Sequence, residues 1–95
     1  MFTVHIEHAV QDFDGWKVVF DRFSDMRTRH RVRRYDVSRP TDDPNYVMIG
    51  LDFDSRSDAD AFLTSMREVW GAPTAATVLA GAPRVRVTES VELGP

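Results

Sequence analysis

The distribution of apolar residues predicts four strands. Phe2–Val10 contains β-branched and aromatic residues and neither Gly nor Pro, which is typical of a strand. Val32–Ser38 and the more apolar Tyr46–Phe53 flank Arg39–Asn45, whose two prolines and two aspartates predict a turn. Because this connection is short, we expect the two flanking segments to form an antiparallel hairpin. Arg84–Leu93 is expected to be the last strand.

Two further segments have the spacing of amphipathic helices, in which apolar residues recur every three or four positions. Asp12 or Asp14 can cap the first helix. Ser55 or Ser57 can cap the second helix, and Ser57 with Asp60 has the spacing of a capping box. The apolar positions are Trp16, Val19, Phe20, Phe23 and Met26 in the first helix, and Ala59, Phe62, Leu63, Met66, Val69 and Trp70 in the second.

The order of these elements, βαββαβ, predicts an α+β fold. It is the order of the ferredoxin-like sandwich, a four-stranded antiparallel sheet with both helices on one face. We expect a single domain over residues 1–95, with Pro73–Ala80 as a short extra helix. Strands two, three and four carry apolar residues on both faces, for example Tyr46 and Met48 beside Val47. Since little chain is left to cover a second face, we predict a homodimer made sheet to sheet.

The run RTRHRVRRYDVSR, residues 27–39, holds six arginines and raises the question of nucleic-acid binding. The following residues 40–60 hold six aspartates, and the hairpin would fold the two segments together. With a turn near residues 41–42, Arg31 would lie near Asp52. By the same register Arg29 would lie near Asp54. We therefore expect a charge-paired hairpin and no nucleic-acid partner; an arginine that binds an anionic ligand, Arg33 or Arg34, is the other interpretation.

Much of the chain also resembles a known group of proteins. The stretches are HAVQDFDGWKVVFDRF (8–23), DDPN (42–45), LDFDSRSDADAFL (51–63) and VRVTESVEL (85–93). They are similar to small proteins of the dimeric α+β barrel superfamily, in particular its antibiotic-biosynthesis-monooxygenase-like and cyclase-like members. The resemblance implies two ferredoxin-like subunits whose sheets pack into a barrel. It also implies small-molecule chemistry, such as oxygenation of polycyclic aromatic compounds without metal or flavin.

Haem degradation, another activity in that superfamily, fits this chain poorly. The haem-degrading members use an Asn on the first strand, a Trp and a His. Here the first strand offers His5 and His8 but no Asn, and no histidine follows Trp70.

The sequence therefore predicts a pocket between helices and sheet that binds an aromatic or polyketide-like compound. The candidate base is His5, because an imidazole titrates near neutral pH, or a tyrosine; the other interpretation of His5 is a partly buried polar residue in the dimer interface or barrel. The function expected is a cofactor-independent monooxygenase or cyclase, and the alternative is a non-catalytic ligand-binding or dimeric interaction module. The residues expected to line the pocket are Trp16, Phe20, Tyr35, Phe62, Met66 and Trp70.

Composition removes several other classes of function. The chain has no cysteine, which excludes disulfides and thiolate chemistry and fits the cytoplasm. His5 and His8 lie three apart on a strand, so they face opposite ways and cannot share a metal ion. No P-loop or nucleophile motif occurs. We expect no metal, no cofactor, no signal peptide and no membrane span.

Overall fold

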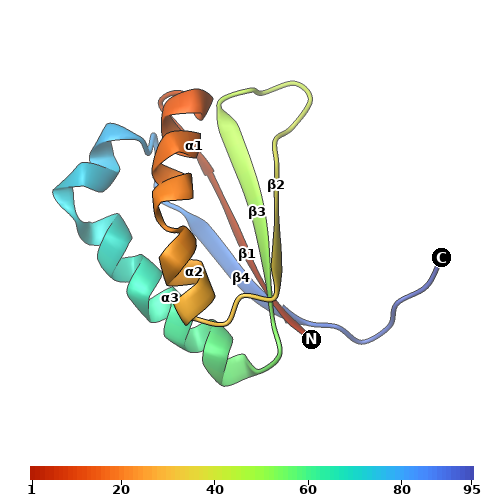
Figure 1. The fold of residues 1–95 in the computed structure, drawn as a ribbon. Coiled ribbons are helices and arrows are strands. Elements are labelled where there is room, and N and C mark those ends of the chain that lie inside the picture. Colours follow the sequence, from red (N-terminus) through yellow and green to blue (C-terminus); the bar gives the residue numbers. More distant parts are fainter.

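The computed structural model shows an antiparallel sheet with all of its helices packed on one face (Figure 1). The structure describes residues 1–95, apart from the side chain of Ala76. Three antiparallel pairings give the strand order β2-β3-β1-β4. The strands are β1 (Phe2–Ala9), β2 (Arg34–Ser38), β3 (Tyr46–Phe53) and β4 (Arg84–Glu89). This arrangement confirms the predicted ferredoxin-like α+β fold.

Alternation along the central strand β1 decides which side chains enter the core. Val4 lies opposite Leu51 on β3 and opposite Val87 on β4, and all three side chains face the helices. Val4, Val47, Leu51 and Phe53 are the largest fully buried side chains. The core therefore lies between the sheet and the helices, and residues of the other parity on β1 face away from it.

The first predicted helix is broken into two. α1 (Phe13–Arg22) ends at Phe23, and α2 (Ser24–Arg29) follows at once. The carbonyl of Phe20 accepts a hydrogen bond from the Phe23 N–H at 3.1 Å and another from Nη1 of Arg27 at 2.8 Å. The guanidinium thus satisfies a carbonyl at the break. At the start of α1 the Asp12 carboxylate accepts the Gly15 N–H, so Asp12 is the cap.

The second helix, α3 (Arg56–Gly71), matches its predicted extent closely. Ser55 caps it by accepting the N–H of Asp58 at 3.1 Å, so the capping box expected from Ser57 is wrong. The extra helix after α3 is a short 3-10 helix over Pro73–Thr77 and ends before the predicted boundary. None of the helices in the described part of the chain is long and apolar enough to cross a membrane.

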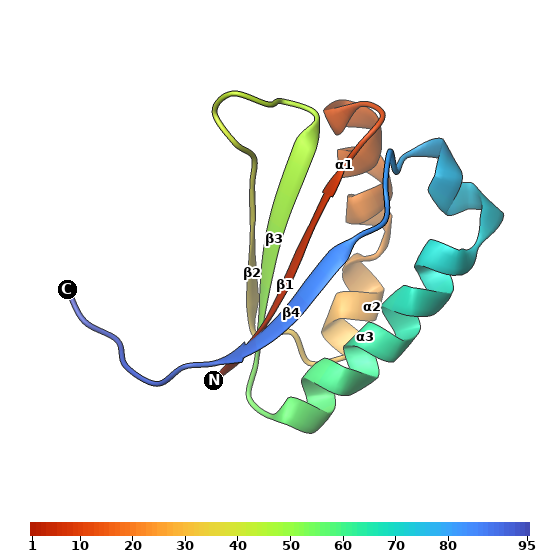
Figure 2. The same ribbon diagram turned by 180° about the vertical axis from the view of Figure 1, so that it is seen from behind.

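The other face of the sheet is not covered by helices (Figures 1 and 2). On β2 and β4 the apolar side chains, such as Val37 and Val85, face the helices only. The expectation of apolar residues on both faces of these strands is therefore wrong, and holds only for β3. Polar side chains on the uncovered face bond to one another. The pairs are Thr3 with Asp52 (2.7 Å), His5 with Thr88 (2.9 Å) and Tyr46 with Glu7 (2.8 Å).

The hairpin of β2 and β3 confirms that arginines meet aspartates, but in a different register. Arg34 lies 3.5 Å from Asp52 and Arg33 lies 3.6 Å from Asp54, in place of the partners predicted from a turn at residues 41–42. β2 pairs Arg34 with Asp52 and Ser38 with Met48, so the turn is centred at residue 43 and the partners shift accordingly.

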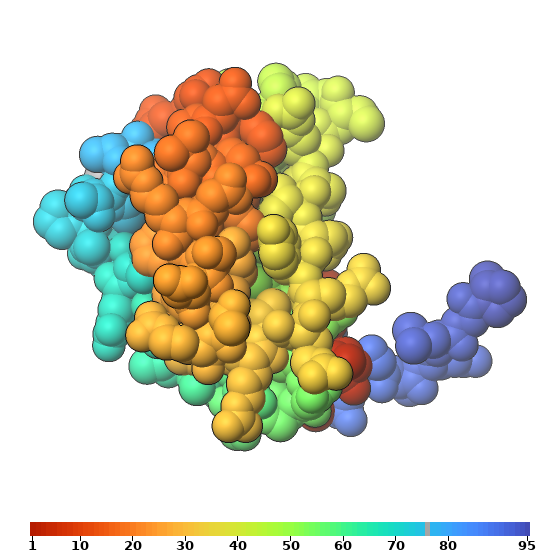
Figure 3. All heavy atoms as spheres, viewed as in Figure 1, coloured from red at the N-terminus to blue at the C-terminus, as the bar shows by residue number. Residues whose placement is uncertain are grey.

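The last strand is shorter than predicted, because β4 ends at Glu89. Ser90 donates its N–H to the carbonyl of Met1, and the following residues extend away from the body on the side opposite the helices (Figures 1–3). Val91 and Leu93 are 94% and 88% exposed. This tail is the most exposed apolar part of the described chain.

Candidate functional site

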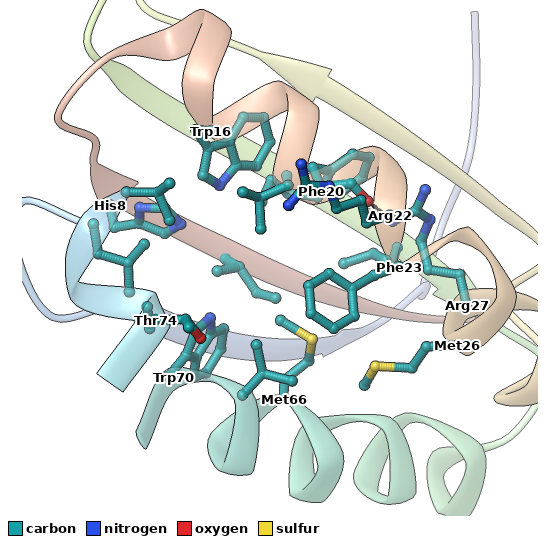
Figure 4. Close-up of a pocket in the computed structure, with 18 of the residues that line it drawn as sticks. His8, Trp16, Phe20, Arg22, Phe23, Met26, Arg27, Met66, Trp70 and Thr74 are labelled. Carbon is teal, nitrogen blue, oxygen red and sulfur yellow. Dashed lines mark hydrogen bonds between the residues drawn. The ribbon is translucent and has the colours of Figure 1, made fainter. Parts of the chain in front are cut away.

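A cavity of about 380 Å³ lies between the helices and the sheet (Figure 4). Ile6, Ile49 and Leu51 on the two central strands form its floor. Side chains of α1 and α3 form opposite walls, and the 3-10 segment after α3 closes one end. A cavity of this size with mostly apolar walls suits a small organic ligand.

Aromatic rings and two thioethers, those of Met26 and Met66, are prominent in the walls. On α1 the rings of Trp16 and Phe20 stack with centroids 5.0 Å apart. On α3 the spacing of Phe62, Met66 and Trp70 puts these side chains on one helical face, and all three line the cavity. Such walls offer flat surfaces on which an aromatic ligand can stack.

His8 is a buried imidazole in the lining, with a relative exposure of 3%. Its Nδ1 lies 3.0 Å from the carbonyl oxygen of Ala9, which can only accept, so Nδ1 carries the proton. In the neutral ring Nε2 is then the unprotonated nitrogen. Burial lowers the pKa of His8, and the hydrogen bond to Ala9 opposes this only in part. His8 is therefore a neutral imidazole with a basic nitrogen available to a bound molecule.

Arg27 is the second buried polar residue of the described chain, with a relative exposure of 8%. Its guanidinium carbon lies 3.9 Å from the ring centre of Phe20 and 4.9 Å from that of Tyr35. These distances are those of cation–π contacts. Figure 4 shows His8 and Arg27 at opposite ends of the lining, with the wall residues Trp16, Phe20, Met66 and Trp70 between them.

The structure brings together most of the residues expected at the pocket. Trp16, Phe20, Phe62, Met66 and Trp70 all line the cavity. Tyr35 lies on β2, outside the lining, with its ring edge-on to Phe20 at 5.3 Å.

His5 is not in the cavity. It lies on the uncovered face of the sheet, where its Nε2 is within hydrogen-bond distance of Thr88. Tyr46 is on the same face, and its hydrogen bond to Glu7 raises the pKa of the Tyr46 hydroxyl.

Two patterns in the sequence indicate the buried positions of His8 and Arg27. His8 has the same strand parity as Val4 and Ile6, which places it on the helix-facing side. Arg27 follows Phe20 by seven residues, so it extends the apolar face of the first helix.

The described residues contain no group of three or more His, Asp or Glu side chains placed to hold a metal ion. The architecture and this cavity define the class of the protein as a ferredoxin-like fold with an aromatic-walled interior site.

Solved structures of the same fold include oxygenases. An antibiotic biosynthesis monooxygenase-like protein of Bordetella bronchiseptica aligns over 96% of this chain and 97% of its own, with a TM-score of 0.76 and 14% identity. SnoaB, a cofactor-independent oxygenase of Streptomyces nogalater, aligns over 99% and 96%, with a TM-score of 0.73 and 13% identity. A dimeric ferredoxin-like protein of an uncultured marine organism aligns over 98% and 97%, with a TM-score of 0.65 and 9% identity.

These similarities establish the fold. No family model and no curated protein matches the sequence. At 14% identity or less to these structures, activity and assembly of this chain have to be argued from its own residues.

Proposed function

We propose that the protein binds a flat aromatic or polyketide-like compound in the cavity and acts on it as a cofactor-independent monooxygenase or cyclase. The observation that carries this proposal is a neutral, buried imidazole, His8, in a cavity with aromatic walls. SnoaB, which shares the fold, gives a precedent for oxygenation without a cofactor. The base predicted from sequence was His5, but the cavity side of β1 carries His8 instead.

In the oxygenase reaction Nε2 of His8 takes a proton from an acidic C–H or O–H of the substrate, which leaves a carbanion or enolate. This anion transfers electrons to dioxygen and forms a C–O bond, giving a hydroperoxide once a proton returns. Removal of the remaining proton on that carbon cleaves the O–O bond. A methylene is thereby oxidised to a carbonyl, while one oxygen atom of dioxygen is reduced to water.

The surrounding side chains favour this chemistry in two ways. Trp16 and Trp70 face the ligand from opposite walls and hold its plane by stacking. The apolar lining also keeps water away from the carbanion, which water would otherwise quench by returning its proton.

The test is oxygen consumption and quinone formation with anthrone as the substrate. We expect His8→Gln to lower the rate at least about 100-fold, because Gln cannot take the proton. His5→Gln tests the competing assignment, in which the reaction occurs on the uncovered sheet face and this variant loses the rate. Equal rates for both variants and wild type would remove both histidines from the mechanism.

A homodimer joined through the sheets is the assembly we propose, with the cytoplasm as its location. The uncovered sheet face and the exposed Val91 and Leu93, which extend on that side, support this assembly. The structural neighbour described as dimeric supplies a precedent. The polar character of the face predicts an interface made largely by hydrogen bonds and by the tail.

Native mass spectrometry and light scattering test the dimer. We expect the full chain to be a dimer and the double variant Val91→Asp, Leu93→Asp to shift toward monomer. Val18→Asp, an equally simple change at an exposed helical position, is the matched control and should leave the dimer intact. A monomeric wild-type protein at micromolar concentration would refute the assembly.

The second candidate function is a non-catalytic ligand-binding module. The same cavity supports it, because the walls would hold an aromatic molecule whether or not a reaction follows. A protein that binds such a molecule but consumes no oxygen and forms no ring with any substrate of this class would favour it.

A further inference from the structure

The feature that the proposed reaction leaves unexplained is the buried positive charge of Arg27. The residue lines the cavity and is 92% buried, yet no carboxylate of the described residues lies within salt-bridge distance of it. The four ion pairs of the described residues are made by Lys17, Arg33, Arg34 and Arg56, each with an aspartate. A buried charge without a counterion is costly, so a second partner is expected.

A structural role explains only one of the hydrogen-bond donors of the Arg27 side chain. One N–H of Arg27 satisfies the Phe20 carbonyl at the break between α1 and α2. A guanidinium has five N–H donors, and this is its one hydrogen bond within the described chain. Satisfying one carbonyl needs a donor but not a full charge.

The two rings beside the guanidinium fix its plane. The ring centres of Phe20 and Tyr35 lie 3.9 Å and 4.9 Å from its central carbon, so cation–π contacts with both rings restrict the orientation of the guanidinium. A guanidinium fixed in this way can donate from its edge to an anionic oxygen group, the geometry in which arginine is most selective. Phe20 itself also belongs to the cavity wall.

We propose that Arg27 selects ligands that carry an anionic oxygen group on a flat aromatic ring system, and that this group takes the place of the missing counterion. This inference rests on the proposed function, because it names the ligand class of the same cavity. The anion would lie at the Arg27 end, which leaves the carbon to be deprotonated toward the His8 end (Figure 4).

Two fluorescent probes that differ by one anionic group test the proposal. N-phenyl-1-naphthylamine is neutral, and 1-anilinonaphthalene-8-sulfonate has the same rings with a sulfonate. We expect the wild-type protein to bind the sulfonate at least about tenfold more tightly, as a charge-assisted hydrogen bond predicts. Arg27→Met, which keeps the length and apolar packing of the side chain, should bring the ratio of the two affinities close to one by weakening binding of the sulfonate far more than binding of the neutral probe.

Arg29→Met is the matched control. It removes one arginine from the same short helix at an exposed position outside the cavity lining. It should leave both affinities as in wild type. If it lowers sulfonate binding as much as Arg27→Met does, general surface charge explains the preference and the proposal is wrong.

The failure of each proposal has its own signature. If the wild-type protein binds neither probe, the proposed cavity function fails. If it binds both with equal affinity, or if Arg27→Met weakens both equally, the cavity remains and Arg27 has a structural role only. Should Arg27→Met fail to fold, displacement of the neutral probe from wild type by 1-naphthoate and by its methyl ester decides the question. The acid should displace it at least about tenfold better, and equal displacement would overturn the proposal.

Discussion

The two faces of the sheet treat the same residue type in opposite ways. His5 and His8 lie on one strand three residues apart. His5 is exposed and lies within hydrogen-bond distance of Thr88, whereas His8 is buried against the helices with its pKa lowered by burial. Parity on a strand, not residue identity, therefore decides which imidazole becomes a candidate base.

The two faces of the sheet also differ in the interactions that stabilise them. The helix-covered face is stabilised by burial of apolar side chains such as Phe53 and Leu51. The uncovered face is stabilised by polar pairs near water, which contribute much less each. Substitutions on the two faces should then differ strongly in their effect on the free energy of unfolding.

The largest expected difference is between Phe53→Ala and Met48→Ala, on the same strand. Phe53 is fully buried and packs on Phe62 with ring centres 5.4 Å apart, whereas Met48 is 40% exposed on the other face. We expect Phe53→Ala to lower the free energy of unfolding by about 3–5 kcal/mol, because it leaves a cavity in the core. In the Val91→Asp, Leu93→Asp background, where the sheet face is free of the proposed partner, Met48→Ala should cost about 0.5 kcal/mol or less. Urea unfolding measures both, and similar losses would contradict the contrast.

One position tests whether the uncovered face also has steric limits. A Cβ on Gly50 would lie 2.5 Å from Oδ1 of Asp36 on the neighbouring strand. We expect Gly50→Ala to cost about 1 kcal/mol, the lower end for overpacking, because the exposed Asp36 side chain can move.

The double variant Gly50→Ala, Asp36→Ser provides the control. It should recover most of that loss, because the atom that crowds the new methyl group has been removed. If the double variant is no more stable than Gly50→Ala alone, the crowding does not come from Asp36.

Much of the fold followed from sequence because its signals are local. The bounds of β3 agree with the prediction at both ends, and the aromatic face of α3 supplied three of the cavity residues. Asp12 was one of the two caps predicted, with Asp14 as the other, because capping depends only on neighbouring residues.

The features that sequence did not predict depend on contacts between distant segments. At the break at Phe23, the Arg27 side chain donates a hydrogen bond to the Phe20 carbonyl. The periodicity of apolar residues continues across the break, so it predicts one uninterrupted helix. The hairpin register pairs Arg34 with Asp52, and the composition of the turn does not fix its centre to a single residue. The cavity side of β1 is the side of Val4 and Ile6, so strand parity alone places His8 there, but its burial beside Trp16 depends on how the helix packs on the sheet.

The smallest expected effect concerns the pH dependence of stability, and it returns to the two histidines. Burial lowers the pKa of His8 below its ordinary value of 6.5, with the Ala9 hydrogen bond as the opposing cause. Well above pH 6.5 the ring is neutral in both the folded and the unfolded state and adds no pH dependence. As the pH approaches and passes 6.5 the unfolded chain takes up the proton first, so the free energy of unfolding falls as pH falls, until the folded protein is also protonated.

We therefore expect a wild-type protein that loses stability between pH 7.5 and about 5.5, and a His8→Gln variant that loses less over the same interval. His5→Gln should keep the part of the pH dependence that comes from His8, because it leaves the buried ring unchanged. Urea unfolding of the three proteins at matched pH values measures the difference in the free energy of unfolding between each variant and wild type. The contributions of titrating groups common to both proteins cancel in this difference. Identical curves for wild type and His8→Gln would mean that His8 meets solvent as freely as a surface residue, and the water-excluding environment required of the candidate base would then be absent.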